Sequence, residues 1–220
     1  GDGYLDAAVG APTASFGPSL EECGAVFVYF GSPSGLDSVA TVLPGRQESS
    51  NFGREVTIAG DLDADGCADL LIGADQASVG EASEGVAEVY FGARSGISPF
   101  GSVLLQSNVM GANFGGHAAG VSDLNGDGCD DVLVGAVRLQ LQESREGAAF
   151  LFLGSRDRRL ERVWWRTGGK PGSWYGSAAS GAGDVNHDGH PDVVVSACAW
   201  DTQQGVNVGK VDLFFGAGPR

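Results

Sequence analysis

The chain has 220 residues, 42% of them hydrophobic, which suffices for one sizeable domain with a buried core. Its longest apolar runs are strand-sized and fall far short of the roughly 20 residues that a transmembrane helix requires, so we expect no membrane span. The formal net charge of −15, from 28 acidic and 13 basic residues, disfavours nucleic acid as a partner and favours cations, with metal ions first among them.

An internal repeat runs through the whole chain. Asp-Gly pairs begin at residues 2, 65, 127 and 188, which are 63, 62 and 61 residues apart. The repeats extend approximately over residues 1–43, 44–105, 106–166 and 167–220. A fixed spacing of this kind indicates an architecture in which equivalent units stack on one another.

In chain order, the repeats present the same elements. An aromatic-glycine pair (Phe52-Gly53, Phe114-Gly115, Tyr175-Gly176) precedes an acidic loop. An apolar run then ends in a small-residue turn, which reads Val9-Gly10-Ala11-Pro12, Ile72-Gly73-Ala74, Val134-Gly135-Ala136 and Val195-Ser196-Ala197. The next apolar segments read GAVFVYFG, GVAEVYFG, GAAFLFLG and GKVDLFFG. Alternating apolar positions between glycine-rich turns predict short strands and little helix.

These repeats predict an all-β fold, a β-propeller built from four-stranded antiparallel blades. A unit of about four short strands cannot bury its own two faces, whereas radially stacked sheets bury one another's faces. We expect the ring of each aromatic-glycine pair to pack between neighbouring sheets. Residues 1–220 would then form a single, partial propeller domain.

Three acidic loops carry the candidate chemistry. Side-chain oxygens stand at positions 1, 3, 5 and 9 of each loop, glycine at position 6 permits a sharp turn, and position 7 can add a backbone carbonyl. The predicted metal ligands are Asp61, Asp63, Asp65, Cys67 and Asp69 in the first loop, Asp123, Asn125, Asp127, Cys129 and Asp131 in the second, and Asp184, Asn186, Asp188, His190 and Asp192 in the third. Cys67, Cys129 and His190 stand at position 7, and we expect them to contribute only their carbonyl oxygens.

This donor set favours Ca²⁺ as the cofactor, at about three sites. Carboxylate and amide oxygens in this number suit calcium, whereas Mg²⁺ demands a tighter octahedron and Zn²⁺ prefers nitrogen or sulfur. Three calcium ions would change the formal charge from −15 to about −9 and relieve the repulsion between the carboxylates. The alternative for any one loop is a solvated acidic turn that binds no metal. Because three loops share the same spacing of acidic residues, this alternative is weaker for all three together.

A partial metal site stands at the start of the chain. Asp2 and Asp6 match positions 5 and 9 of the loops, whereas positions 1 and 3 are missing. Two carboxylates alone would bind a cation weakly. We expect the sequence to be a piece of a longer propeller; the alternative is that something else completes the site.

The four cysteines suit either redox compartment. Cys67 and Cys129 occupy equivalent places in two repeats, which is a positional pattern rather than a bridging one. Cys23 and Cys198 are the other possible disulfide pair, and free buried thiols are the alternative.

The sequence offers no catalytic motif, so we expect that the protein is not an enzyme. It has no Gly-x-Ser-x-Gly elbow, and it has no P-loop because Lys170 precedes Pro171 and Lys210 precedes Val211. Two alternatives to a protein-binding scaffold stay open. One is a lectin-like, glycan-binding propeller, and the other is a structural module that accompanies a catalytic domain such as a calcium-dependent hydrolase.

The whole chain resembles the FG-GAP repeats of the integrin α-subunit propeller and of related bacterial surface proteins. The resemblance rests on Phe52-Gly53, Phe114-Gly115, the Gly-Ala-Pro at 10–12 and the three acidic loops. The fourth repeat departs from the pattern, with Tyr175-Gly176 and with Ser196-Ala197-Cys198. The family implies a seven-bladed ring of about twice this length, with calcium between the first and second strands of a blade. It also implies cell adhesion or protein binding in an extracellular, cell-surface or periplasmic setting.

The resemblance further implies how the arc is built and where partners bind. It gives 14 strands here: three in an incomplete first blade, eight in two full blades and three in an incomplete last blade. The ring is then open, or it is completed by a homo-oligomer. Partners, either a protein ligand or a glycan, would bind the face opposite the calcium loops. The loops of that face are residues 12–23, 44–51, 75–84, 106–113, 137–146, 167–173 and 199–208.

Overall fold

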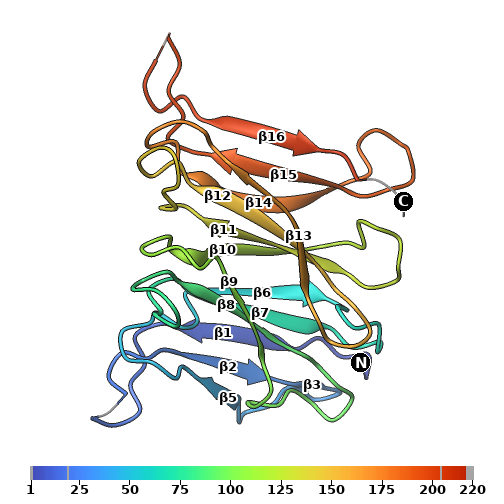
Figure 1. Cartoon of the computed structure of the whole chain (residues 1–220). Coiled ribbons are helices and arrows are strands. Elements are labelled where there is room, and N and C mark those ends of the chain that lie inside the picture. The colour runs from blue at the N-terminus through green and yellow to red at the C-terminus, as the bar shows by residue number, and fades with distance from the viewer. Residues whose placement is uncertain (1, 19, 204, 217–220) are drawn as a thin grey trace.

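The computed structural model describes residues 2–18, 20–203 and 205–216. It is an all-β arc of antiparallel sheets that stack face to face in chain order, from the N-terminal sheet at the bottom of Figure 1 to the C-terminal sheet at the top. Ser19 and Gln204, two positions of the predicted partner-binding loops, lie outside the described residues, as do Gly1 and residues 217–220. Among the described residues, no helix has the length and apolar character needed to cross a bilayer.

Four sheets have the strand numbers that the resemblance predicted. The first contains β1 (Ala7–Ala11), β2 (Ala25–Tyr29) and β5 (Thr41–Pro44), and the second contains β6 (Glu55–Gly60), β7 (Asp69–Ala74), β8 (Val86–Tyr90) and β9 (Val103–Gln106). The third contains β10 (Phe114–Val121), β11 (Asp131–Ala136), β12 (Ala148–Leu153) and β13 (Glu161–Thr167), and the fourth contains β14 (Tyr175–Gly183), β15 (Asp192–Ala197) and β16 (Lys210–Phe214). The prediction of an all-β, propeller-like stack is therefore confirmed.

One small sheet was not predicted. The strands β3 (Gly31–Ser32) and β4 (Gly35–Leu36) form a hairpin within the connection from β2 to β5. Two-residue strands leave no periodic pattern in a sequence, because alternation needs about four residues to be recognised.

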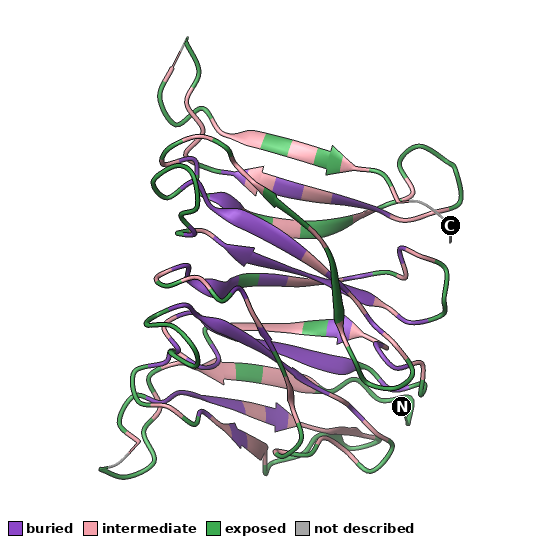
Figure 2. Cartoon of the chain, in the orientation of Figure 1, coloured by how far each residue is buried: buried purple, intermediate pink, exposed green. Residues whose placement is uncertain are grey.

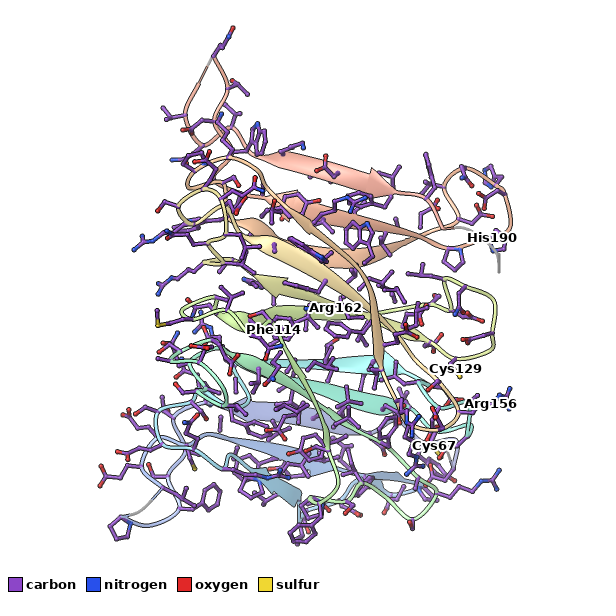
Figure 3. All side chains as sticks on the ribbon, in the orientation of Figure 1. Cys67, Phe114, Cys129, Arg156, Arg162 and His190 are labelled. Atoms are coloured by element: carbon purple, nitrogen blue, oxygen red, sulfur yellow. The ribbon has the colours of Figure 1, made fainter. Side chains whose placement is uncertain are left out.

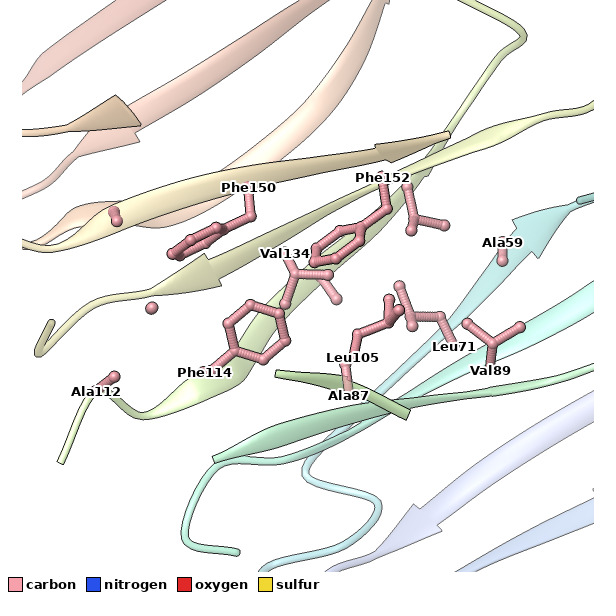
Figure 4. Packing of buried hydrophobic residues seen from close by; sticks show 14 of the residues in the cluster. Ala59, Leu71, Ala87, Val89, Leu105, Ala112, Phe114, Val134, Phe150 and Phe152 are labelled. Carbon is pink, nitrogen blue, oxygen red and sulfur yellow. The ribbon is translucent and has the colours of Figure 1, made fainter. Parts of the chain in front are cut away.

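The hydrophobic core lies between the sheets, in three separate clusters. The aromatic residue of each aromatic-glycine pair is almost completely buried in one of them: Phe52 between the first and second sheets, Phe114 between the second and third, and Tyr175 between the third and fourth. Figure 4 shows Phe114 facing Phe150 and Phe152 across the central interface. The predicted packing of these rings between neighbouring sheets is confirmed.

Burial follows the position of each strand in the stack. All six residues of β7 and all six of β11 are buried because sheets cover both of their faces. In β16, by contrast, exposed and half-buried residues alternate, as expected when one face of a strand is covered. Figure 2 shows this change from the buried middle of the stack to the more exposed fourth sheet.

Close backbone contacts explain the glycine of the small-residue turn. A Cβ atom on Gly73 in β7 would overlap the carbonyl oxygen of Gly115, which belongs to the aromatic-glycine pair of the next sheet. Gly10 stands in the same relation to Gly53, and Gly135 to Gly176. The repeat signature is therefore a packing device: each glycine lets the backbone of the following sheet approach without a side chain in between.

The cysteines are free thiols rather than a disulfide pair, and one tryptophan packs between two sheets. All four thiols are free; Cys23, Cys67 and Cys129 are buried and Cys198 is exposed. The Trp164 ring lies 4.7 Å from the Phe214 ring, which makes it part of the interface between the third and fourth sheets.

Candidate metal centre

The three acidic loops lie side by side along one edge of the stack. Each joins the first strand of a sheet to the second: β6 to β7, β10 to β11 and β14 to β15. Figure 3 labels Cys67, Cys129 and His190, one from each loop, along this edge. The repeat in the sequence therefore places equivalent carboxylates at equivalent points of successive sheets.

The carboxylate at position 1 accepts backbone hydrogen bonds from positions 5 and 6 of its own loop and so closes the turn. In the first loop, Asp61 Oδ1 accepts a hydrogen bond from the Asp65 N–H at 3.0 Å, and Asp61 Oδ2 accepts one from the Gly66 N–H at 2.9 Å. Asp123 accepts the corresponding bonds from Asp127 and Gly128, and Asp184 accepts them from Asp188 and Gly189. Three separate segments thus adopt one conformation, which turns the side chains of positions 1, 3 and 5 inward.

Positions 3 and 5 continue the pattern. The oxygen of position 3 accepts the N–H of position 5 at 3.0–3.2 Å in all three loops, and the carboxylate of position 5 accepts the N–H of position 7 at 2.8–2.9 Å. In the first loop, Asp61, Asp63 and Asp65 each have an oxygen within 4.8 Å of the other two. Three carboxylates this close repel one another unless a cation is present. The loop therefore has the donor chemistry of a hard divalent cation site.

The second and third loops carry less charge, because asparagine replaces aspartate at position 3. Asn125 Nδ2 donates to Asp127 Oδ2 at 2.9 Å, and Asn186 Nδ2 donates to Asp188 Oδ2 at 2.8 Å. An uncharged asparagine at position 3 does not repel the carboxylate of position 5, and its amide instead donates a hydrogen bond to that carboxylate. The asparagine oxygens still accept the N–H of position 5, as Asp63 does in the first loop.

Position 4 adopts a left-handed backbone conformation that the sequence did not reveal. Ala64 has a φ of 56° and His187 a φ of 60°, and Gly126 has the corresponding angle of 76° in the second loop. Only glycine adopts this conformation without strain. The hydrogen bonds around position 1 hold it in place in all three loops, and the only signal in the sequence was the glycine at residue 126.

The aspartates at position 9 are anchors of the fold. Asp69, Asp131 and Asp192 are fully buried, and each accepts two backbone hydrogen bonds. In Asp69, Oδ2 accepts the Leu62 N–H and Oδ1 accepts the Gly92 N–H, both at 2.8 Å. The other two aspartates make the same pair of bonds. Position 9 therefore ties the loop to the segment after the third strand, and a metal would use lone pairs that these bonds leave free.

Burial raises the pKa of Asp69 and of Asp131 to about 7. The two backbone N–H bonds oppose this shift, whereas the neighbouring carboxylates at positions 1 and 3 or 5 of the same loop add to it. Burial of the carboxyl group is thus the main cause of the raised pKa, and the negative charge of the loop is a smaller contribution.

Position 7 presents its backbone to the loop in each case. The Cys67 and Cys129 side chains are buried, and the N–H of each donates to the carboxylate at position 5. Burial, with Asp127 nearby, raises the pKa of the Cys129 thiol, which favours the neutral form over the thiolate that binds metals. The expectation that these cysteines act through the main chain stays a prediction.

The partial site at the start of the chain repeats two of these roles. Asp2 Oδ1 accepts the Tyr4 N–H at 3.0 Å, as position 5 does in the complete loops. Asp6 Oδ1 accepts the Gly31 N–H at 2.8 Å, as position 9 does. These two residues thus match positions 5 and 9 in structure as well as in sequence.

The first two loops are linked to each other. The Asp130 N–H donates to the Asp61 carbonyl at 3.0 Å, and the Asp61 N–H donates to Asp130 Oδ2 at 2.9 Å. Asp130 stands at position 8 of the second loop. The third loop has Pro191 there, which has neither an N–H nor a carboxylate, so it cannot form the same link.

The first loop also contacts a basic side chain from the third sheet. Arg158, in the turn between β12 and β13, lies 2.6 Å from Asp63 and 3.3 Å from Asp65. This contact could not be predicted from local sequence patterns, since 95 residues separate Arg158 from Asp63.

On the opposite edge, the structure corrects one expectation. Glu84 belongs to loop 75–84 of the predicted partner-binding face, but it is fully buried and its Oε1 accepts N–H groups of residues 79–81. A buried carboxylate that accepts three backbone bonds stabilises its own loop. Loops 167–173 and 199–208 of that face meet: the Lys170 ammonium lies 5.2 Å from the centre of the Trp200 ring, and the Lys210 ammonium lies 4.6 Å from it.

Two family models and several known proteins match segments of this chain that contain the repeats and the acidic loops. The model of the FG-GAP repeat matches residues 52–90, and the model of the FG-GAP-like repeat matches residues 123–195. Integrin alpha-4 of Xenopus laevis is 37% identical over 141 residues, which is 62% of this chain and 13% of that protein. Integrin alpha-PS3 of Drosophila melanogaster is 33% identical over 156 residues, which is 70% of this chain and 14% of that protein. Integrin alpha-11 of Homo sapiens is 28% identical over 185 residues, which is 82% of this chain and 15% of that protein.

Proposed function

The chain belongs to the FG-GAP repeat family and is integrin-α-like, and from this premise we propose that it is a calcium-binding, non-catalytic module of a cell-adhesion protein. The chain spans only 13–15% of the length of the relatives described above. Adhesion is therefore the role that we propose for a longer protein, and the propeller segment is the part of it described by this sequence.

The observation that carries the calcium proposal is the shared conformation of the three loops. In each, position 1 accepts two backbone N–H groups, position 3 accepts the N–H of position 5, and position 5 accepts the N–H of position 7. A solvated turn has no reason to repeat this arrangement three times. The ligands that we propose are the residues predicted from the sequence, at positions 1, 3, 5, 7 and 9 of every loop, with Asp2 and Asp6 as part of a fourth site.

Calcium is the cation that fits this donor set. The donors at positions 1, 3, 5 and 9 are carboxylate or amide oxygens, and burial raises the pKa of the Cys129 thiol, which disfavours the thiolate form that zinc prefers. When bound, calcium would supply positive charge at the point where the carboxylates converge. We propose that about three ions bind and that they stabilise the connection between the first and second strands of each sheet.

The protein-binding surface that we propose lies on the edge opposite the loops. We expect a protein ligand there, in an extracellular or cell-surface setting where free calcium fills sites of modest affinity. The domain that we propose is a single, partial propeller. The rest of the ring would come from a longer polypeptide or from further copies of the chain.

Calcium stoichiometry tests the proposal directly. Equilibrium dialysis followed by elemental analysis should find about three calcium ions per wild-type chain and about two in Asp65→Ala, Asp127→Ala or Asp188→Ala. Asp37→Ala is the matched control, because Asp37 is exposed and lies outside the loops; it should keep the wild-type stoichiometry. A wild-type chain that retains no calcium would contradict the proposal.

A further inference from the structure

The first acidic loop holds a side chain that belongs to the next sheet. We propose that Arg158 is an internal counter-cation for loop 61–69, which competes with Ca²⁺ for Asp63 and Asp65. The inference rests on the proposed calcium function. It predicts that loop 61–69, which has the most carboxylates, binds calcium less tightly than its ligand charge alone would give.

The contacts of Arg158 carry this inference. Its Nε donates to Asp63 Oδ2 at 2.6 Å, and its Nη2 donates to Asp65 Oδ2 at 3.3 Å. The Asp63 side chain is only 3% exposed, so this ion pair is partly shielded from water although Arg158 itself is 52% exposed. A guanidinium that bridges two carboxylates makes stronger hydrogen bonds than a single surface pair.

No oxygen of the two aspartates stays without a partner. Asp63 Oδ1 accepts the Asp65 N–H and Asp65 Oδ1 accepts the Cys67 N–H, so Arg158 takes the two Oδ2 atoms that the loop itself leaves open. Arg158 must leave these Oδ2 atoms before they can face another cation. Cation binding at this loop therefore includes the cost of breaking two charged hydrogen bonds.

Arg158 stands at a turn position where the first two sheets have glycine. Its φ is 60°, in the left-handed region that disfavours side chains. The equivalent turns of the first two sheets have glycine at this point, Gly35 with a φ of 109° and Gly96 with a φ of 105°. The turns are otherwise alike, since Arg158 N–H donates to Ser155 and Gly96 N–H donates to Ala93, both at 2.9 Å.

Phe91 supports the same orientation of the arginine. The guanidinium carbon of Arg158 lies 5.1 Å from the centre of the Phe91 ring, close enough for a cation–π interaction. Phe91 follows β8 in the second sheet, so the arginine is held between a ring and two carboxylates of the same sheet. This arrangement keeps the guanidinium at the loop in the metal-free chain.

By ligand charge alone, the first loop would bind calcium more tightly than the second and third loops. The first loop has four aspartates at positions 1, 3, 5 and 9, whereas the second and third have three aspartates and one asparagine. More carboxylates favour tighter calcium binding. Among the described residues, however, no ion pair joins the second or third loop to an arginine or lysine. Arg156 lies beside Gly128 of the second loop but forms no ion pair with its carboxylates. Arg158 is therefore the cation that pairs directly with loop carboxylates, and it does so at the first loop.

Calorimetric titration with calcium chloride tests the competition. Arg158→Gln should lower one of the calcium dissociation constants by roughly fivefold, which is the effect of losing one partly exposed ion pair. The matched control is Arg159→Gln, because Arg159 is the next residue and its own ion pair with Asp157 is largely exposed; it should leave all constants unchanged. Adding Asp65→Ala to Arg158→Gln should remove the tightened site and so assign it to the first loop.

Unfolding temperature gives a second readout that needs no calcium affinity. In a chelator, Arg158→Gln should unfold at a lower temperature than the wild type and than Arg159→Gln, because Asp63 and Asp65 lose their counter-cation. In saturating calcium the three proteins should unfold together. If Arg158→Gln fails to fold, Arg158→Gly serves instead, since it matches Gly35 and Gly96 and removes the backbone strain.

The outcomes separate the two proposals. Absence of calcium binding in the wild-type chain would overturn the calcium function. Calcium binding with equal constants in the wild type and in Arg158→Gln would overturn the role of Arg158 while leaving the calcium function intact.

Discussion

Replacing Gly73 by alanine tests the idea that the repeat signature is a packing device. The new methyl group would overlap the backbone carbonyl oxygen of Gly115 in the third sheet. A flexible side chain could move aside, but a carbonyl at the start of β10 cannot move without shifting the sheet. Gly73 has no left-handed φ, so the expected effect is steric.

The size of the effect follows from two opposing contributions. Forcing a methyl group into a closely packed site costs about 1–3 kcal/mol or more, and the overlap here is with backbone, at the upper end of that range. Replacing glycine by alanine in an unstrained strand stabilises by about 0.4–1 kcal/mol. We therefore expect Gly73→Ala to lose about 2–3 kcal/mol, which in a chain of this size lowers the unfolding temperature by roughly 5–10 °C.

Gly181→Ala is the matched control. Gly181 lies in β14, and the nearest atoms to an added Cβ are 3.9 Å away. It should unfold at the wild-type temperature or slightly above. Thermal unfolding followed by circular dichroism, at fixed calcium concentration, compares the three proteins. Equal unfolding temperatures for Gly73→Ala and Gly181→Ala would refute the packing explanation.

Three more predictions concern single contacts. Glu146→Gln should lower the free energy of unfolding by about 2 kcal/mol, whereas the control Glu143→Gln should leave it almost unchanged. Burial raises the pKa of Glu146, but the backbone N–H groups that its carboxylate accepts outweigh burial and hold the pKa below 4.5. The ionised carboxylate therefore contributes its full share to the free energy of unfolding above pH 4.5. Urea titrations should find that share lost as the pH falls further. Asp130→Ala should speed hydrogen exchange of the Asp61 N–H, which loses its acceptor; unchanged exchange would contradict the link between the loops. A thiol reagent should modify Cys198 rapidly and the three buried cysteines only on unfolding; rapid modification of more than one thiol per chain would contradict their burial.

The features that the sequence predicted correctly depend on local patterns. Repeat spacing and alternation predicted the strands, because each strand is set by a few consecutive residues. The positions of Phe52, Phe114 and Tyr175 between sheets followed from the same register. The β3–β4 hairpin was missed because its strands are too short to show a period.

Features that depend on distant contacts could not be predicted. Arg158 meets Asp63 across 95 residues of sequence, and nothing near either residue indicates the pair. Glu84 stands in a polar loop and reads as exposed, yet backbone N–H groups that no sequence pattern reveals surround its carboxylate. Asp69 fits the ligand spacing, but only the fold shows that both of its oxygens already accept backbone bonds.

The most direct test of the calcium account is the unfolding temperature of the wild-type chain with calcium and with a chelator. A ligand that binds only the folded state, present at one hundred times its dissociation constant, stabilises by about 2.7 kcal/mol per site. With about three sites filled, the account predicts a rise in unfolding temperature of roughly 10 °C or more in calcium. Identical unfolding in calcium and in chelator would contradict it and leave the acidic loops as turns that hold no metal.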